Sequence, residues 1–121
     1  MNEIRNNKPL VAIVLPVYNT ERYLPECLAS LIGQSYSHFH VFAVNDGSTD
    51  NSAQILNQIA TEDKRFTVVN KKNGGASSAR NVALDLISKL GIFEYICFVD
   101  SDDIVMPNFL ERFVSTMEEG N

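Results

Sequence analysis

Three carboxylates follow one apolar run in the last quarter of the sequence. Asp100, Asp102 and Asp103 lie within four positions, directly after Phe98 and Val99. Like charges this close raise one another's pKa, so the cluster requires a cation or a set of hydrogen-bond donors. Aspartate oxygens are hard ligands that suit Mg²⁺ or Mn²⁺, but Asp and Ser are also the usual residues of turns and helix N-caps. These positions alone leave a metal site and a structural turn equally open.

The elements that must position this cluster are predicted from the pattern of apolar residues. Short runs rich in β-branched residues and bounded by turn residues predict strands buried on both faces, at 10–15, 39–44, 66–69 and 95–99. Apolar residues at helical spacing predict helices near 24–32, 53–60 and 79–90, and a last one from Pro107 through Met117. The alternation predicts an α/β fold, a parallel sheet with right-handed helical crossovers.

Polar loops follow all four predicted strands. Ligands of parallel α/β sheets bind beyond the carboxyl ends of the strands. That rule gathers four segments at one edge of the sheet: Pro16–Asn19, Asp46–Asp50, Asn73–Arg80 and Asp100–Asp103. One shared site is therefore a simpler interpretation than four unrelated turns.

The residue types in these loops suit a nucleotide. Tyr18 offers an aromatic face for a base, and the Asp46 carboxylate can accept hydrogen bonds from a base or a ribose. The turn at Asn73–Ser78 presents N–H groups at a helix start, where anions bind, and Arg80 could pair with a phosphate or a carboxylate. Taken singly, Tyr18 is more often a packed aromatic and Arg80 more often an ion-pair partner.

A metal-bridged nucleotide diphosphate would satisfy all of these groups together. Carboxylates and phosphates repel each other unless a divalent cation lies between them. Two other phosphate-binding patterns do not occur in the sequence: G-x-x-x-x-G-K-[ST], and G-x-G-x-x-G after the first strand.

Composition narrows the choice of partners and location. A chain of 121 residues fits one domain, and a net charge of −5 argues against nucleic acid or an anionic membrane as the main partner. There is no apolar run of about 18 residues and no secretory apolar core at the start. Cys27 and Cys97 lie among apolar residues, which predicts buried free thiols in a reducing cytosol. His38 and His40 lack a nearby third metal ligand.

Several short motifs, in this order, resemble those of the family 2 glycosyltransferases. They are Val14–Asn19, Val44–Asp50, Asn73–Gly75, Ala79–Asn81 and Phe98–Asp103. The resemblance covers residues 10–113. It implies the GT-A fold, in which a Rossmann-like nucleotide-sugar-binding half precedes an acceptor-binding half.

The resemblance also assigns roles to individual residues. Pro16 and Tyr18 would line the base and ribose pocket. Asp46 would accept a hydrogen bond from the base, which is usually uracil in this family, and Arg80 and Ser101 would lie on the nucleotide-sugar side of the site.

The resemblance also implies a metal-binding D-x-D motif, formed by Asp100 and Asp102. Asp102 would bind Mn²⁺ or Mg²⁺ directly, Asp100 would face the ribose or the metal's waters, and Asp103 would assist. Asn45 departs from the pattern, because many relatives have an aspartate there.

The implied reaction is transfer of a sugar from a nucleotide diphosphate, usually a UDP-sugar, to a saccharide or lipid-linked acceptor, with inversion. Relatives continue well beyond this length, so we expect a lead-in at residues 1–9, a donor-binding domain at 10–121 that is incomplete, and the general base beyond Asn121. The resemblance leaves open a peripheral association of the complete protein with the inner face of the membrane. A non-catalytic sugar-nucleotide-binding or scaffold module is the alternative.

Overall fold

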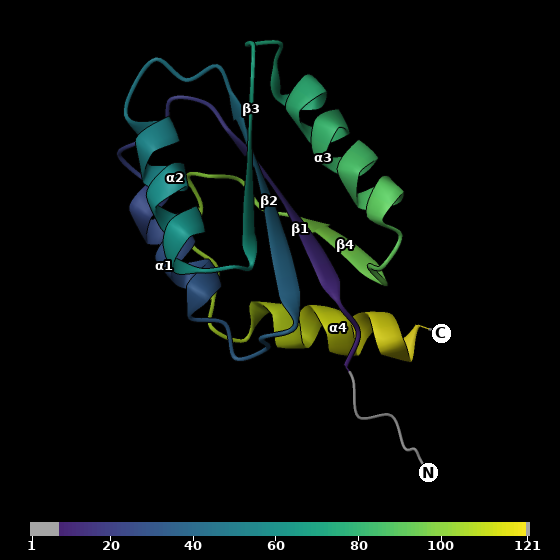
Figure 1. Ribbon diagram of the computed structural model, residues 1–121. Coiled ribbons are helices and arrows are strands. Elements are labelled where there is room, and N and C mark those ends of the chain that lie inside the picture. Colours follow the sequence, from purple (N-terminus) through teal and green to yellow (C-terminus); the bar gives the residue numbers. More distant parts are fainter. Residues whose placement is uncertain (1–7, 121) are drawn as a thin grey trace.

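A single sheet of four parallel strands organises the computed structural model, which describes residues 8–120. The strands are β1 (Val11–Val17), β2 (Phe39–Asp46), β3 (Phe66–Lys71) and β4 (Tyr95–Phe98), in the spatial order β3-β2-β1-β4. The helices are α1 (Leu24–Ile32), α2 (Ser52–Glu62), α3 (Ala76–Leu90) and α4 (Phe109–Glu119). Figure 1 shows α1 and α2 on one side of the sheet and α3 on the other. The predicted α/β fold is confirmed; residues 1–7 of the expected lead-in lie outside the described residues.

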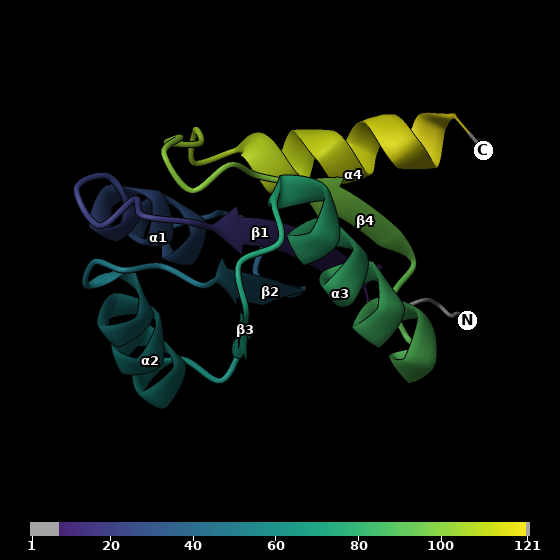
Figure 2. The ribbon, with the colours of Figure 1, turned by 90° about the horizontal axis from the view of Figure 1, so that it is seen from above.

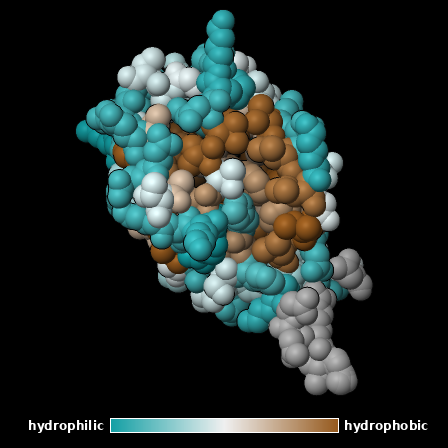
Figure 3. All heavy atoms as spheres, viewed as in Figure 1, coloured by the Kyte–Doolittle hydropathy of each residue, from teal (hydrophilic) through white to brown (hydrophobic). Residues whose placement is uncertain are grey.

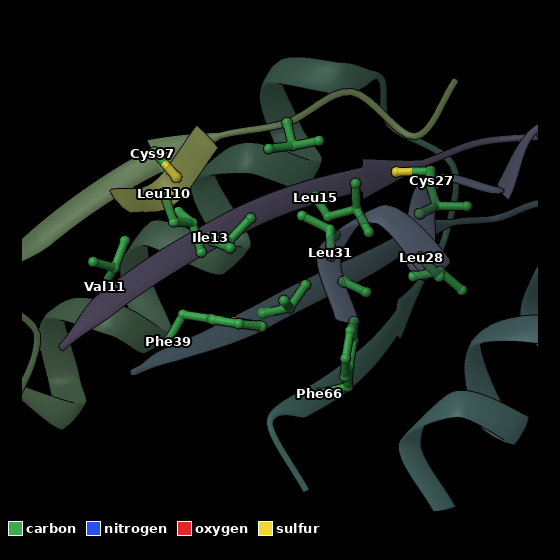
Figure 4. Close-up of a cluster of buried hydrophobic side chains, with 14 of the residues drawn as sticks. Val11, Ile13, Leu15, Cys27, Leu28, Leu31, Phe39, Phe66, Cys97 and Leu110 are labelled. Atoms are coloured by element: carbon green, nitrogen blue, oxygen red, sulfur yellow. The ribbon is translucent and has the colours of Figure 1, made fainter. Parts of the chain in front are cut away.

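Side chains of the central strand β1 alternate between two hydrophobic cores, as the two-residue period of a strand requires. Ile13 and Leu15 belong to the larger core, which α1, α2 and α4 cover with residues such as Leu31 (Figure 4). Ala12 and Val14 belong to the second core, which α3 covers. All four side chains on β1 are fully buried. β1 therefore holds both helical layers, which lie on opposite sides of the sheet in Figure 2.

Three strands, β1, β2 and β3, run further than the sequence predicted, and the extensions shape the strand-end edge. Pro16 was expected to end the first strand, but β1 continues to Val17 and Pro16 pairs with Val44 of β2. β4 pairs with β1 only as far as Val14. Pro16 therefore lies where β1 has a neighbour on one side only, so its missing N–H costs no ladder bond. β2 likewise runs on through Asp46, which pairs with Lys71 of β3.

The last helix begins at Phe109, two residues later than expected, because its start is set by a distant side chain. Pro107 lies in the preceding turn rather than in the helix. Gln34 is buried and accepts a hydrogen bond from the Leu110 N–H at 2.8 Å, while its amide donates to the Met106 carbonyl at 2.6 Å. Gln34 thereby satisfies backbone groups that a local cap would normally serve.

α3 begins and ends at glycines. Gly91 has φ 64° at its C-terminal end, the left-handed cap that the sequence predicted, and Gly75 has φ 99° at its start. Apolar surface remains over β3 and α3 in the centre of Figure 3. Partly buried side chains, among them Val69 and Leu86, pack against the second core. Within residues 8–120, no helix combines the length and apolar composition needed to cross a bilayer; the longest, α3, has 15 residues.

Candidate functional site

A cleft of about 460 Å³ opens at the carboxyl ends of the strands. It brings together the loops that the sequence placed at this edge; those after β1, β2 and β3 lie toward the top of Figure 1. The lining residues come from all four strand ends and from the start of α3: Pro16, Val17, Tyr18, Thr20, Asp46, Asn73, Gly75, Ala76, Ala79, Asp100, Ser101 and Asp102. The convergence expected from the parallel topology is confirmed.

The acidic turn after β4 forms one cluster of carboxylates. One side-chain oxygen from each of Asp100, Asp102 and Asp103 lies within 4.8 Å of the other two, and all three residues are exposed. The Asp103 N–H donates to the Asp100 carbonyl at 3.0 Å, so the cluster is built on a tight turn. Three hard oxygen donors on one turn fit a small divalent cation such as Mg²⁺ or Mn²⁺.

Asp46 lies in the floor of the cleft with its carboxylate fully engaged. One carboxylate oxygen accepts from Lys71 Nζ at 2.7 Å and from the Gly74 N–H at 2.9 Å. The other accepts from the Gly75 N–H at 2.8 Å and from Asn73 Nδ2 at 3.2 Å. Burial raises the pKa of this carboxyl, but the hydrogen bonds from Lys71, Gly74 and Gly75 outweigh burial and hold the pKa below its usual value. These four donors match the carboxylate's four acceptor positions.

The glycine turn after β3 is therefore an anion-binding turn whose anion is the chain's own carboxylate. The sequence predicted that N–H groups of Asn73–Ser78 would face a ligand, but those of Gly74 and Gly75 face Asp46. The N–H groups of the first turn of α3 remain without helical partners, as at every helix start. Ala76 and Ala79 of this helix line the cleft, whereas Arg80 is partly exposed and outside the lining.

Asn19 holds the loops after β1 and β2 together. Its backbone has φ 50°, in the left-handed region that asparagine tolerates better than most residues. Its side-chain oxygen accepts hydrogen bonds from the Thr49 N–H at 2.7 Å and the Asp50 N–H at 3.3 Å, and its own N–H donates to Ser48 Oγ at 3.0 Å. These bonds place Tyr18, which is 49% exposed, at the mouth of the cleft.

Asn45, the departure from the family pattern, has an internal structural role. It is buried, and its amide group donates to Asn70 Oδ1 at 2.9 Å while its oxygen accepts from the Ser48 N–H at 3.1 Å. A carboxylate could accept the second bond but could not donate the first. The side chain thus joins β2 to β3 and orders the turn after Asp46.

Some residues of the site had no signal in the sequence. The sequence assigns no role to Lys71, and it places Asn73 only in a turn and a short family motif. Thr20 and Ser52 match no motif, although Thr20 lines the cleft and both side chains join loops. Nothing in the local pattern around Thr20 could have revealed its partner, which lies 81 positions away at Ser101.

Other candidate groups lie apart from this chemistry. A more apolar groove of about 400 Å³ between α1 and α2 has Glu62 as the one ionisable residue in its lining. His40 Nε2 contacts Thr67 Oγ1 at 2.6 Å, and burial lowers the pKa of this imidazole. Cys27 and Cys97 are buried free thiols, as predicted.

Comparisons with known proteins agree on one family. The family model described as Glycosyl transferase family 2 matches residues 12–121. Glycosyltransferase GlyG of Streptococcus pneumoniae is 39% identical over 111 residues, which cover 91% of this chain and 36% of the relative. The uncharacterized glycosyltransferase EpsJ of Bacillus subtilis is 40% identical over 111 residues, 92% of this chain and 31% of the relative. The chain thus spans about a third of the length of these relatives.

Solved structures share the same architecture. S. aureus TarS 1–349 in complex with UDP superposes with a TM-score of 0.78 at 32% identity, over 90% of this chain and 32% of that one. The complex of TarS 1–349 with UDP-GlcNAc superposes with a TM-score of 0.78 at 34% identity, over 90% of this chain and 31% of that one. The mannosyltransferase PcManGT from Pyrobaculum calidifontis, in complex with GDP-Man and Mn²⁺, shares the fold with a TM-score of 0.70 at 24% identity, over 82% and 29%.

Proposed function

Because this chain belongs to glycosyl transferase family 2 and has its GT-A fold, we propose that the strand-end cleft binds the nucleotide diphosphate-sugar donor, with UDP as the nucleotide. The observation that carries the proposal is the meeting of the carboxylate cluster, Tyr18 and the start of α3 in one cleft. The S. aureus TarS structures with UDP and UDP-GlcNAc support the choice of nucleotide.

The acidic turn is proposed to hold a divalent cation, Mn²⁺ or Mg²⁺. Asp102 is the direct ligand, Asp100 faces the ribose or the metal's waters, and Asp103 adds a third carboxylate. When bound, the cation supplies positive charge that offsets the charge of the diphosphate, including the charge that develops as the bond to the sugar breaks. The mannosyltransferase complex with Mn²⁺ is consistent with such a site on this fold.

The other side of the cleft is proposed to hold the nucleoside. Pro16 and Tyr18 form the wall against which base and ribose pack, with Ser101 beside them. An imide N–H of uracil can bond to Asp46 only where it replaces one of that carboxylate's own four donors. Lys71 is the donor most easily replaced, because its ammonium also reaches the Lys72 carbonyl at 2.6 Å.

Transfer to an acceptor is proposed for the complete protein. This chain covers about a third of its relatives' length, so we assign the acceptor pocket, the general base and any contact with the membrane to other parts of the protein. The acceptor is a saccharide or a lipid-linked saccharide, and the transfer is inverting. Arg80, which lies near the cleft but outside its lining, is assigned to the nucleotide side.

Calorimetric titration of UDP, with and without Mn²⁺, tests the donor site. We expect UDP binding to require the metal and to weaken roughly tenfold or more in Asp102→Ala, as is typical when metal coordination is disturbed. Asp85→Ala is the matched control, because Asp85 is exposed on α3 and pairs only with Lys89 of the same helix at 3.2 Å within the described chain. Binding that ignores both Mn²⁺ and Asp102→Ala would refute the metal assignment.

A further inference from the structure

Thr20, in the loop between β1 and α1, is bonded to the middle of the acidic turn. Its hydroxyl donates to the Ser101 hydroxyl at 2.9 Å, and Ser101 is the residue between Asp100 and Asp102. Ser101 is only 5% exposed, so water cannot freely replace Thr20 as its partner. Breaking this bond would leave a buried hydroxyl unsatisfied, which is costlier than losing an exposed bond.

Thr20 is itself fixed by the start of α2. The Thr20 N–H donates to Ser52 Oγ at 3.1 Å, and Ser52 is fully buried. The Ser52 N–H donates to one carboxylate oxygen of Asp50 at 2.9 Å, and the Glu21 N–H donates to the other at 3.1 Å. The backbone on both sides of Thr20 is therefore held by the loop after β2, and Thr20 passes that constraint to the loop after β4.

Few other contacts restrain the acidic turn at this point. Its start is held by the Val99 N–H, which donates to the Val14 carbonyl at 3.0 Å, and by the Cys27 thiol, which lies 3.6 Å from the Asp100 carbonyl. Beyond its far end, the Val105 N–H donates to Ser30 Oγ at 3.2 Å. Within residues 8–120, Thr20 is the one hydrogen-bond partner of the Ser101 side chain. The orientation of Ser101, and with it the directions of its two neighbours, depends on Thr20.

The carboxylate spacing leaves little tolerance for movement. Oxygens bound to one Mg²⁺ lie about 2.0–2.1 Å from it and so at most about 4 Å from each other. The cluster spans up to 4.8 Å between carboxylate oxygens. The gap can close by side-chain rotation alone, provided that the backbone between Asp100 and Asp102 stays where it is.

We propose that Thr20 is a positioning residue, which holds the Asp100 and Asp102 carboxylates at the spacing that a divalent cation requires by fixing Ser101 between them. The proposal rests on the proposed donor site, because it explains how the metal-binding turn keeps its shape before the cation binds. Thr20 acts through Ser101, whose hydroxyl it contacts between the two carboxylates.

Mn²⁺ alone, titrated into the 121-residue chain and followed by the EPR signal of the free ion, tests the proposal. One hydrogen bond is worth about 0.5–1.5 kcal/mol, so we expect Thr20→Val to weaken Mn²⁺ binding about two- to tenfold and Thr20→Ser to restore it. Thr67→Val is the matched control, because it also removes one bonded threonine hydroxyl, at 2.6 Å from His40, but on β3. Equal Mn²⁺ affinity in Thr20→Val and wild type would overturn the proposal.

Amide hydrogen exchange in the metal-free chain separates this proposal from the donor-site proposal. The Asp103 N–H, which donates to the Asp100 carbonyl, should exchange several-fold faster in Thr20→Val and at the wild-type rate in Thr20→Ser. If the wild type binds no Mn²⁺, the metal assignment fails, and unchanged Asp103 exchange would then overturn the role of Thr20 by itself. Should Thr20→Val not fold, Ser101→Ala breaks the same bond and must give the same faster exchange.

Discussion

Replacement of Asp46 by alanine should destabilise the whole fold. The Asp46 side chain is 3% exposed and pairs at 2.7 Å with the ammonium of Lys71, whose side chain is 17% exposed. It also accepts from the backbone N–H groups of Gly74 and Gly75 at 2.9 and 2.8 Å. Asp46→Ala would leave one largely shielded cation and two backbone N–H groups without the partner that joins β2 to the turn after β3.

The expected cost is about 3 kcal/mol. Removing one member of a buried ion pair typically costs about 3–5 kcal/mol, because the other charge stays buried. Lys71 retains the Lys72 carbonyl as an acceptor at 2.6 Å, which places the loss at the lower end of that range. Since domains are stable by only about 5–15 kcal/mol, this is a large share of the total.

Urea unfolding at pH 7, followed by far-UV circular dichroism, measures this cost in a chain that has no tryptophan. The control Asp85→Ala breaks an exposed ion pair with Lys89 and should change the free energy of unfolding by no more than about 0.5 kcal/mol. A loss in Asp46→Ala as small as that of the control would refute the anchoring role. Asp46 would then serve only to bind a ligand and not to stabilise the fold.

Wild type and Asp46→Ala should also differ in how their stability changes with acid. Burial raises the pKa of the Asp46 carboxyl, but its hydrogen bonds from Lys71, Gly74 and Gly75 hold it below the unfolded value of about 3.9. The stability that the Asp46 carboxylate contributes to the fold is therefore fully present above the unfolded pKa, and it is lost as the pH falls through the folded pKa. The difference in unfolding free energy between wild type and Asp46→Ala should stay constant from neutral pH to about pH 5 and narrow below about pH 4. A difference that persists unchanged in stronger acid would contradict the lowered pKa.

Two further predictions concern the glycine turns and the thiols. Gly47→Ala, where φ is 72° and a Cβ would lie 2.7 Å from the Asn73 nitrogen, should cost about 2 kcal/mol or more in urea unfolding. Gly75→Ala should cost about 1–3 kcal/mol from backbone strain alone, because only glycine readily adopts its φ of 99° and ψ of 164°, although nothing lies within 4 Å of an added Cβ; a loss near zero would contradict this backbone conformation. Burial raises the pKa of Cys27 and of Cys97 to about 12, so a thiol reagent at pH 8 should label both in urea and neither in the folded chain. Rapid labelling of the folded chain would contradict the burial.

The sheet and the position of its cleft could be predicted from the sequence because both follow from local patterns. The run from Leu10 to Leu15 has the composition of a strand buried on both faces, and the loops after such strands meet by topology. The ends of the strands were predicted less accurately. Pro16 interrupts an apolar run in sequence, yet it is harmless where β4 no longer pairs with β1.

Side-chain partners could not be predicted, because they depend on distant residues. Asp46 was expected to face a ligand, but its four donors come from Lys71 and the turn after it, 25 or more positions away. Gln34 lies just past the end of α1, yet it serves the start of α4 from 76 positions away. Asp46 meets Lys71 through the parallel register of β2 and β3, and Gln34 meets Leu110 through tertiary packing. No local sequence motif encodes either contact.

Paramagnetic broadening by Mn²⁺ tests the central claim, that the strand-end cleft holds a metal-bound nucleotide, most directly. In ¹H–¹⁵N spectra of the chain with UDP, a trace of Mn²⁺ should broaden the resonances of Asp100–Asp103 first and those of the nearby Gly75 next. Glu118 and Glu119, an exposed acidic pair at the end of α4, serve as the internal control and should stay sharp. Broadening centred on Glu118 and Glu119, or spread evenly over all acidic residues, would contradict a metal-nucleotide site in the cleft.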